Sequence, residues 1–226
     1  MTARSVPPPA TTVCTGCSPP TTDHDFVVPG PRSPVPARAA SHRVGVDHDL
    51  GVRALALAER RFGGAKELDH YASLVVSTGV GGAVVLDGRL LDGRTGNAGH
   101  LGHVIVEPEG HDCSCGSRGC LEAEVSGWAL ERDSGQPAHR ADEATRIRVG
   151  ELVGRGVGSF MAVFDLETCF VSGSVALGFG ATFFRAANEE ASRVARLSYC
   201  EGVEIVPSAL GTDGPLLGAA CVAWST

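Results

Sequence analysis

The chain has 226 residues, of which 43% are hydrophobic and 20% are charged, and its formal net charge at pH 7 is −7. This composition suits one large or two small globular domains. Basic residues do not cluster among aromatic ones, and no apolar run approaches the roughly 20 residues that span a bilayer, so we expect neither a nucleic-acid partner nor a membrane-spanning segment.

Residues 1–43 contain most of the thirteen prolines and show neither helical nor strand periodicity. Such a stretch cannot bury enough apolar surface to offset the entropy lost on ordering, so we expect it to be disordered. Cys14 and Cys17 form a lone CxxC there. Without a second pair of ligands, this motif favours two spectator thiols over a metal site.

An α/β pattern begins near residue 44. We expect a short strand over 43–46 and a helix over Asp49–Phe62, which Gly63 and Gly64 end. Asp87 and Gly88 predict a hairpin turn between two strands. The other expected elements are strands over 73–77, 83–87, 89–91, 169–171 and 203–206, and helices over 150–164, 177–197 and 215–224.

Asp49, at the start of the first helix, has two interpretations. Aspartate is a preferred helix N-cap, which would make it structural. A carboxylate exposed at a helix N-terminus can also orient a hydroxyl group and accept its proton. Asp47 could supply the cap instead, so the residues alone leave both interpretations open.

Residues 77–82 (Ser-Thr-Gly-Val-Gly-Gly) join two expected strands. Three glycines in four residues let backbone N–H groups converge on phosphate oxygens. The segment is neither a Walker A loop nor a dinucleotide fingerprint, because no Gly-Lys-Ser/Thr and no helix follow it. Taken alone, it favours a tight hairpin over a phosphate-binding nest.

Three cysteines lie close together at Cys113, Cys115 and Cys120, and a histidine precedes them at His103. One His and three Cys are a common ligand set for a closed structural zinc site. Thiols at metal-ligand spacing fit a reducing compartment, and the N-terminus lacks the order of a secretory signal, so we expect a cytoplasmic protein.

His100 and Glu122 flank this cluster. His100 follows a glycine-rich turn, so one of the two histidines could bind metal while the other faces a ligand. Glu122 comes two residues after Cys120, so closing the metal site would also fix its position. The metal loop would then act as a scaffold that directs polar side chains into a cleft.

These motifs resemble the ROK family of sugar kinases and repressors. The similarity covers about residues 44–226 and rests on the order and spacing of 78–82, 96–99, 102–103 and 113–122, with further matches at 173–178 and 205–211. In motif detail the chain is most similar to the family's bacterial N-acetylmannosamine kinases and glucokinases. The resemblance implies an α/β, actin-like (ribonuclease H-like) ATPase fold, with two lobes and a cleft between them.

The resemblance also implies a role for individual residues. Asp49 matches the catalytic base that takes the proton of a hexose or N-acetylhexosamine 6-hydroxyl, and ATP with Mg²⁺ would donate the phosphoryl group. The sugar contacts would come from His48, Asn97, His100, His103 and Glu122. The ATP contacts would come from Thr78, Gly79, Gly81, Gly82 and Gly173. Structural Zn²⁺ would be held by His103, Cys113, Cys115 and Cys120.

The chain departs from the family pattern in three places. His48 stands where the family usually has Asn, and His100 where glucokinases have Glu. A carboxylate accepts two hydroxyl hydrogen bonds, whereas a neutral imidazole accepts one and donates one, so we expect a different preferred sugar. The Asp-x-Gly-Gly-Thr turn that begins family kinases is absent upstream of Asp49. We therefore expect an incomplete first lobe, with 44–70 as its remnant, 71–212 as the large lobe and 213–226 as a C-terminal helix.

Three functions fit these observations. The first is a sugar kinase, most similar to N-acetylmannosamine or glucose kinases. The second is a non-catalytic sugar-binding or regulatory protein that lacks a complete ATP site. The third is a zinc-stabilised interaction module. A repressor is disfavoured, because the proline-rich residues 1–43 cannot form a helix-turn-helix. The resemblance further implies a homo-oligomer.

Overall fold

A computed structural model describes residues 49–224 of the chain. The expectations for 1–48, including the disordered tract, the CxxC, the strand over 43–46 and His48, lie outside the described residues. The strands are β1 (Tyr71–Val76), β2 (Val80–Leu86), β3 (Arg89–Leu90), β4 (Thr168–Ser172) and β5 (Glu204–Pro207). The helices are α1 (Asp49–Phe62), α2 (Leu121–Val125), α3 (Gly127–Ser134), α4 (Glu143–Phe164), α5 (Ser174–Val194) and α6 (Gly214–Trp224). In this part of the chain, no helix is both long and apolar enough to cross a membrane.

The five strands form one mixed sheet in the order β3-β2-β1-β4-β5. β1 pairs with β2 and β2 with β3 in antiparallel fashion, whereas β1 with β4 and β4 with β5 are parallel. The antiparallel pairs are joined by short turns, and the parallel pairs by helical crossovers, as their geometry requires. The sheet confirms the expected α/β class and makes β1 its central strand.

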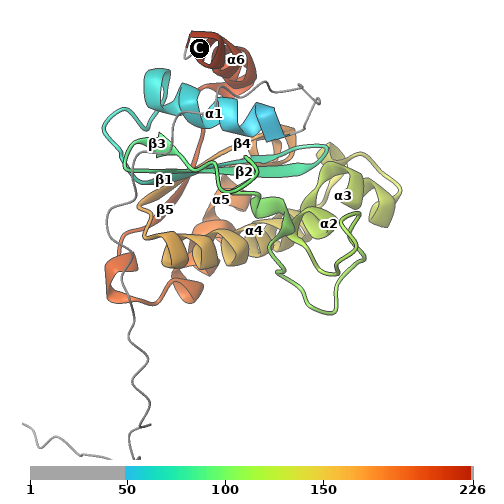
Figure 1. The fold of residues 1–226 in the computed structure, drawn as a ribbon. Helices are drawn as coiled ribbons and strands as arrows, with labels where there is room; N and C mark the ends of the chain where they lie inside the picture. Colours follow the sequence, from blue (N-terminus) through green and yellow to red (C-terminus); the bar gives the residue numbers. More distant parts are fainter. Residues whose placement is uncertain (1–48, 225–226) are drawn as a thin grey trace, which may run out of the picture. The chain divides into compact units, whose positions relative to one another are not determined.

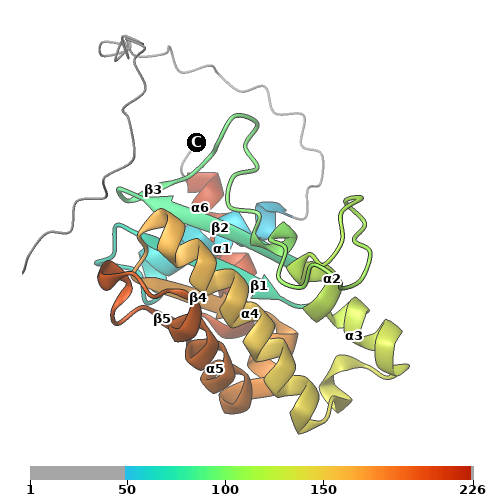
Figure 2. The same cartoon turned by 90° about the horizontal axis from the view of Figure 1, so that it is seen from below.

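Helices cover both faces of this sheet. α1 and α6 lie on one face, and α4 and α5 lie on the other (Figures 1 and 2). α2 and α3 follow one another beyond the end of β1, where the Gly127 N–H donates to the carbonyl of Ser77 at 2.7 Å. This end of the central strand is where the candidate site lies.

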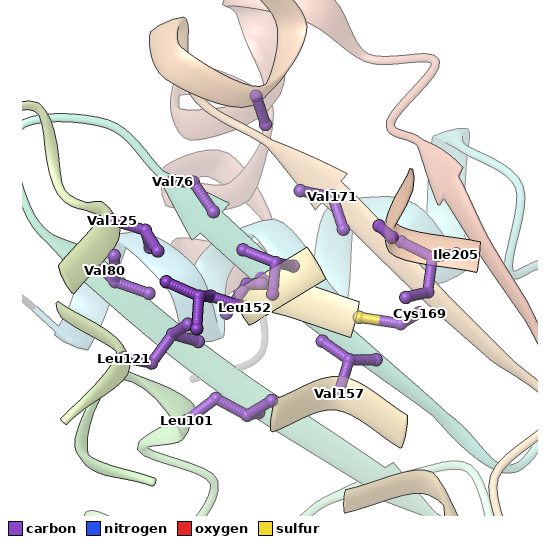
Figure 3. Packing of buried hydrophobic residues seen from close by; sticks show 14 of the residues in the cluster. Val76, Val80, Leu101, Leu121, Val125, Leu152, Val157, Cys169, Val171 and Ile205 are labelled. Atoms are coloured by element: carbon purple, nitrogen blue, oxygen red, sulfur yellow. The ribbon is translucent and has the colours of Figure 1, made fainter. Parts of the chain in front are cut away.

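The larger apolar core lies between the sheet and α4, α5 and α2 (Figure 3). Leu74 and Val76 of β1 point into it and are fully buried, as are Leu121 and Val157. The opposite face of the sheet carries a smaller cluster that includes Tyr71 and packs against α1. Because β1 has side chains buried on both faces, it reads as a nearly continuous apolar run.

Two buried polar groups fasten α1 to the sheet. The hydroxyl of Tyr71 donates to the carbonyl of Ala56 at 2.7 Å. The carboxylate of Glu59 is fully buried and accepts hydrogen bonds from the hydroxyl of Ser208 and from the N–H of Gly64. These bonds hold the helix that begins at Asp49 in a fixed place over the sheet.

α4 and α5 pack closely because α4 presents a row of glycines. A Cβ at Gly150 would lie 2.6 Å from the carbonyl oxygen of Phe183, and one at Gly154 would lie 2.3 Å from that of Ala187. A Cβ at Gly158 would lie 3.0 Å from the carbonyl oxygen of Ala191, a less severe approach. Residues four apart share one helix face, so the three glycines form a single groove that receives α5.

Several expectations about individual elements are confirmed. α1 has the expected bounds, and the hairpin turn forms at Asp87 and Gly88, which both have positive φ. Two expectations are corrected. The helix expected from 150 begins at Glu143, where the Asp142 side chain accepts from the Thr145 N–H, and the helix expected from 177 begins at Ser174. The short helices α2 and α3 were not predicted.

Candidate functional site

Four potential metal ligands converge beside α2. The ligand atoms of His103, Cys113, Cys115 and Cys120 all lie within 4.8 Å of one another. The distance from Cys113 Sγ to His103 Nδ1 is 3.6 Å, and that from Cys115 Sγ to Cys120 Sγ is 3.7 Å. A tetrahedral zinc ion with ordinary bond lengths sets these separations at about 3.6 and about 3.8 Å. The donor set and its spacing therefore fit Zn²⁺.

The loop between His103 and Cys120 folds through its own backbone. The Cys113 N–H donates to the carbonyl of Ser117 at 2.8 Å, and the Gly116 N–H to that of Cys113 at 3.0 Å. Gly119 has φ of +71°, and a Cβ there would lie 1.7 Å from the carbonyl oxygen of Glu107. Only glycine fits at that position, so the sequence itself requires the bend that brings the sulfurs together.

The thiols of this cluster differ in their surroundings. Burial, aided by the neighbouring thiols of Cys113 and Cys115, raises the pKa of Cys120 to about 12. A hydrogen bond from the backbone of Ser117 lowers the pKa of the exposed Cys115. Three thiolates this close repel one another, and a bound divalent cation is what would allow them to ionise together.

A cavity of about 800 Å³ lies next to this loop and opens between α1, the β1–β2 turn and α2. It brings together five of the residues expected to contact sugar or ATP, although they come from separate parts of the chain. They are Thr78, Gly79, Gly81, His100 and Glu122. Asp112, Cys113 and Ser114 of the metal loop also line it. The cavity and the metal loop thus share a wall.

Glu122 connects the metal loop to the turn between β1 and β2. It lies in the first turn of α2, two residues after the ligand Cys120, and its Oε2 accepts the Val80 N–H at 3.0 Å. The two histidines separate as their spacing suggested: His103 lies with the cysteines, and His100 lines the cavity. Their ring centroids are 4.6 Å apart.

The glycine segment forms a hairpin. Gly81 and Gly82 lie within β2, where they pair with Val75 and Leu74. Of the four residues of this segment expected to contact ATP, only Thr78 and Gly79 lie in the turn, which spans 77–79. The glycine at position 82 has a different use. A Cβ there would lie 2.6 Å from the carbonyl oxygen of Gly99, so its absence lets the segment before His100 approach the strand.

A second cavity, of about 280 Å³, lies between the same turn and the start of α5. Gly173 is the N-cap of α5, with φ of +101°, and a Cβ there would lie 2.2 Å from the carbonyl oxygen of Val76. The next residue, Ser174, lines the cavity, and its hydroxyl lies 3.0 Å from that of Ser77. α5 begins here, but Gly180, with φ of +61° and ψ of −143°, interrupts it, so residues 174–179 form a short first segment whose backbone N–H groups are close to the cavity.

One expected sugar contact, Asn97, is not among the residues that line the cavity, and the expected base, Asp49, is located by its place in α1. Asn97 is exposed and donates to Thr95 Oγ1 at 3.3 Å, and it is not part of the cavity wall. Asp49 is the first residue of α1. Val52, one turn further along α1, lines the large cavity, so the start of this helix lies beside it.

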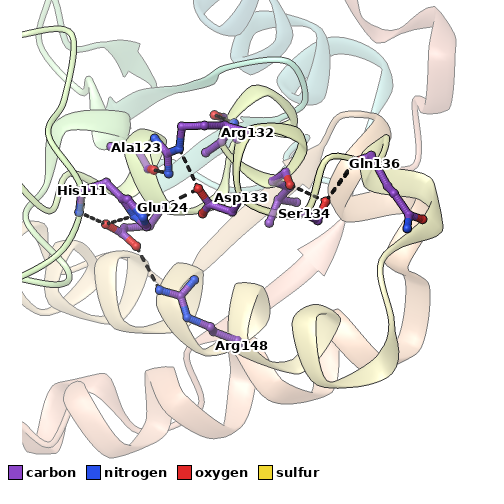
Figure 4. A network of polar contacts seen from close by, with 11 residues as sticks. His111, Ala123, Glu124, Arg132, Asp133, Ser134, Gln136 and Arg148 are labelled. Carbon is purple, nitrogen blue, oxygen red and sulfur yellow. Dashed lines mark hydrogen bonds and ion pairs between the residues drawn. The ribbon is translucent and has the colours of Figure 1, made fainter.

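A buried carboxylate that the sequence analysis missed braces the metal loop (Figure 4). Glu124 of α2 accepts the His111 N–H at 2.6 Å and lies 2.9 Å from the guanidinium of Arg148 on α4. Burial by itself would raise the pKa of Glu124, but these hydrogen bonds outweigh it and hold that pKa below its usual value. No motif marks Glu124, since only the folded loop brings His111 to it.

Comparisons with known proteins agree with this geometry. The model of the ROK family matches residues 38–225. A glucokinase from Thermotoga maritima is 31% identical over 216 residues, which cover 82% of this chain and 67% of that protein. An N-acetylmannosamine kinase from Haemophilus influenzae is 31% identical over 206 residues, covering 83% of this chain and 66% of that protein.

Among solved structures, the ROK hexokinase from Thermus thermophilus is similar with a TM-score of 0.69 and 36% identity. The match covers 76% of this chain and 63% of that one. It supports the expected actin-like fold. This chain spans about two thirds of the length of the proteins that it resembles.

Proposed function

Because this chain belongs to the ROK family, we propose that it is a sugar kinase that transfers a phosphoryl group from Mg·ATP to the 6-hydroxyl of a hexose or N-acetylhexosamine. The observation that carries the proposal is the large cavity, where His100, Glu122 and Thr78 meet beside the four-ligand loop. Phosphoryl transfer is catalysed mainly by positioning and charge neutralisation. A cavity lined both by polar side chains and by the turn between β1 and β2 is suited to positioning two substrates.

The sugar would occupy the large cavity. His100 and Glu122 are two of the hydrogen-bonding side chains on its wall, and we assign Asn97, His103 and His48 to the same role by family resemblance. Asp49 would orient the 6-hydroxyl and accept its proton as the phosphorus–oxygen bond forms. Val52 places the first turn of α1 at the cavity, which supports this role for Asp49.

The phosphate donor would approach through the smaller cavity. Ser77 and Thr78 of the turn border it, together with the start of α5 after Gly173. Backbone N–H groups at a helix N-terminus attract phosphate oxygens, which supports this placement of the donor. We assign Gly81 and Gly82 to shaping the turn from within β2.

We propose that Zn²⁺ is held by His103, Cys113, Cys115 and Cys120. With four protein ligands the ion would be structural, fixing the loop and the start of α2. The chemistry at the sugar then belongs to the side chains that α2 and the loop position. Glu122 is the clearest of these, since it comes two residues after the proposed ligand Cys120, in the first turn of α2.

We further propose a cytoplasmic homo-oligomer that binds small molecules and no nucleic acid. For the domains, 71–212 would form the large lobe, and 44–70 a remnant of the first lobe. α1, from that remnant, packs on the sheet of the large lobe, and α6, the helix expected over 213–226, packs against α1.

A coupled assay with ATP against glucose, mannose and N-acetylmannosamine tests the kinase. We expect turnover with at least one sugar, and a loss of at least a hundredfold in kcat for Asp49→Asn, because removing a general base typically costs about 10²–10⁴. Glu189→Asn, on the exposed surface of α5, is the matched control and should leave kcat unchanged. Sugar binding by calorimetry without turnover would support the non-catalytic alternative instead.

A further inference from the structure

Three residues line both cavities: Ser77, Thr78 and Trp128. They mark the place where the proposed acceptor and donor spaces adjoin. In a phosphoryl transfer, the two substrates must meet at such a junction, with the reacting oxygens in line. Ser77 and Thr78 belong to the turn already described, whereas Trp128 has no role so far.

Trp128 is held rigidly at this junction by its backbone. It is the second residue of α3, whose first turn is capped by Ser126, which accepts the Ala129 N–H at 3.1 Å. The Trp128 N–H donates to the carbonyl of Thr78 at 3.3 Å. The neighbouring Gly127 N–H donates to the carbonyl of Ser77 at 2.7 Å, so α3 is fastened to the turn at two successive residues.

The side chain of Trp128 is unusually accessible for so large an apolar group. It is 61% exposed, and the guanidinium of Arg132 lies 5.3 Å from the centroid of its ring. Exposed tryptophan is common at ligand sites, because its ring offers a large apolar face and its N–H a hydrogen bond. Arg132 lies over one face of the indole, so the exposed area of the ring, which can contact ligands, is its other face and its edge.

We propose that Trp128 is a binding residue shared by the two substrates, and that it contacts the sugar in the larger cavity and the nucleotide in the smaller one. This inference rests on the proposed kinase function. It assigns to one side chain a contact with each ligand. Loss of the ring should therefore weaken both binding steps, whereas an ordinary surface tryptophan would affect neither.

The chain has only two tryptophans, Trp128 and Trp224, so the test can use intrinsic fluorescence. In a Trp224→Phe background, Trp128 is the sole tryptophan. Its emission is followed while the protein is titrated with N-acetylmannosamine or glucose, and separately with a non-hydrolysable ATP analogue and Mg²⁺. Calorimetry on the same protein measures both affinities independently of the indole.

We expect each ligand to change the emission of Trp128 with the midpoint that calorimetry gives. Trp128→Ala should weaken both ligands by roughly tenfold, as the loss of one stacked ring does, and Trp128→Phe should restore much of the affinity. Val163→Ala is the control, because Val163 is 77% exposed and lines neither cavity.

The outcomes separate this inference from the proposed function. Suppose that calorimetry shows both ligands to bind, but one of them neither changes the emission of Trp128 nor binds more weakly to the Trp128→Ala variant. The shared role of Trp128 is then wrong, and the kinase proposal stands. If neither ligand binds by calorimetry, both proposals are overturned.

Discussion

At the scale of single residues, the most constrained polar group near the candidate site is Glu124. Its side chain is completely buried, and it accepts hydrogen bonds from the backbone and ring of His111 and from Arg148. A buried carboxylate is tolerated only when such partners replace its hydration. Glu124 therefore fixes the far side of the metal loop to α2 and α4 without contacting the ligands.

We expect Glu124→Gln to lower the free energy of unfolding at pH 7 by about 1–3 kcal/mol, because a charge-assisted set of bonds is lost. The folded pKa of Glu124 lies below its unfolded value, so its contribution is full above the unfolded pKa and disappears as pH falls through the folded pKa. The difference between wild type and variant should therefore shrink below about pH 4. Urea unfolding at pH 7 and pH 3.5 measures this, with Glu189→Gln on the exposed surface as the control. A difference that grows on acidification would contradict the assignment.

Both the sequence and the site suggest that His100 determines which sugar is preferred. It lines the cavity as an imidazole, where the glucokinase pattern has a carboxylate. We expect His100→Glu to raise the ratio of kcat/KM for glucose to that for N-acetylmannosamine by roughly tenfold, the effect of about one hydrogen bond to a charged group. The metal content of the variant should be unchanged, which checks that His103 nearby still binds. An unaltered ratio would show that His100 does not select the sugar.

At the scale of elements, the glycines of α4 show how a local cost becomes a packing requirement. Read alone, each glycine weakens the helix by up to about 1 kcal/mol relative to alanine. In the fold, Gly150 and Gly154 face α5 at distances that leave no room for a methyl group, and Gly158 leaves little. The sequence alone shows the cost of these glycines in helix propensity. Only the packing of α4 against α5 shows the close contact that offsets this cost.

We expect Gly154→Ala to destabilise the protein by about 1–3 kcal/mol, since its Cβ would lie 2.3 Å from the carbonyl oxygen of Ala187 and α5 would have to move. Gly178→Ala in α5 is the matched control. Nothing lies within 4 Å of a Cβ there, so the higher helix propensity of alanine should leave stability unchanged or raise it. Thermal unfolding of both variants shows whether the contact with α5 or the helix propensity of the residue determines stability. Equal stability of the two variants would show that the groove is not needed.

The metal loop behaves as an element of its own. We expect elemental analysis to find about one zinc per chain, and Cys115→Ser to lose it, because only three ligands remain. Amide hydrogen exchange should then speed up in the loop and in α2, and stay slow in β1 and β4. Ser117→Ala, which keeps the backbone carbonyl that Cys113 uses, should retain the metal. Full zinc content in Cys115→Ser would exclude the proposed ligand set.

At the scale of the whole molecule, the elements with strong periodicity could be predicted from the sequence, and the short ones could not. The apolar spacing of α1 and the Asp-Gly turn after β2 were sufficient to place both. α2 and α3 are short and depend on partners distant in sequence, although Ser126 and Gly135 carry the cap signals of α3. The beginning of α4 was missed because its first two turns present almost no buried apolar side chains: within 143–149, only Val149 is buried.

The candidate site was predictable where its residues are close in sequence. The cysteines and His103 lie within eighteen positions, so ligand chemistry alone grouped them. The meeting of His100 and Glu122 with Thr78 depends on the antiparallel pairing of β1 with β2, which no local pattern reveals. Trp128 and Glu124 belong to no sequence motif. Their places, Trp128 in the lining of both cavities and Glu124 in hydrogen bonds to the metal loop and α4, are evident only in the folded chain.

Two backbone hydrogen bonds close the base of the metal loop, and they bear on how well the protein tolerates insertions and deletions in that loop. Backbone bonds from Val106 to Gly119 and from Leu121 to Val104 tie the two ends of the loop together before the chain enters α2. A segment tied in this way can be lengthened, shortened or transplanted between homologues while the sheet beneath stays intact. The metal loop is therefore the natural position at which to engineer a different cavity wall while keeping the same sheet and helices.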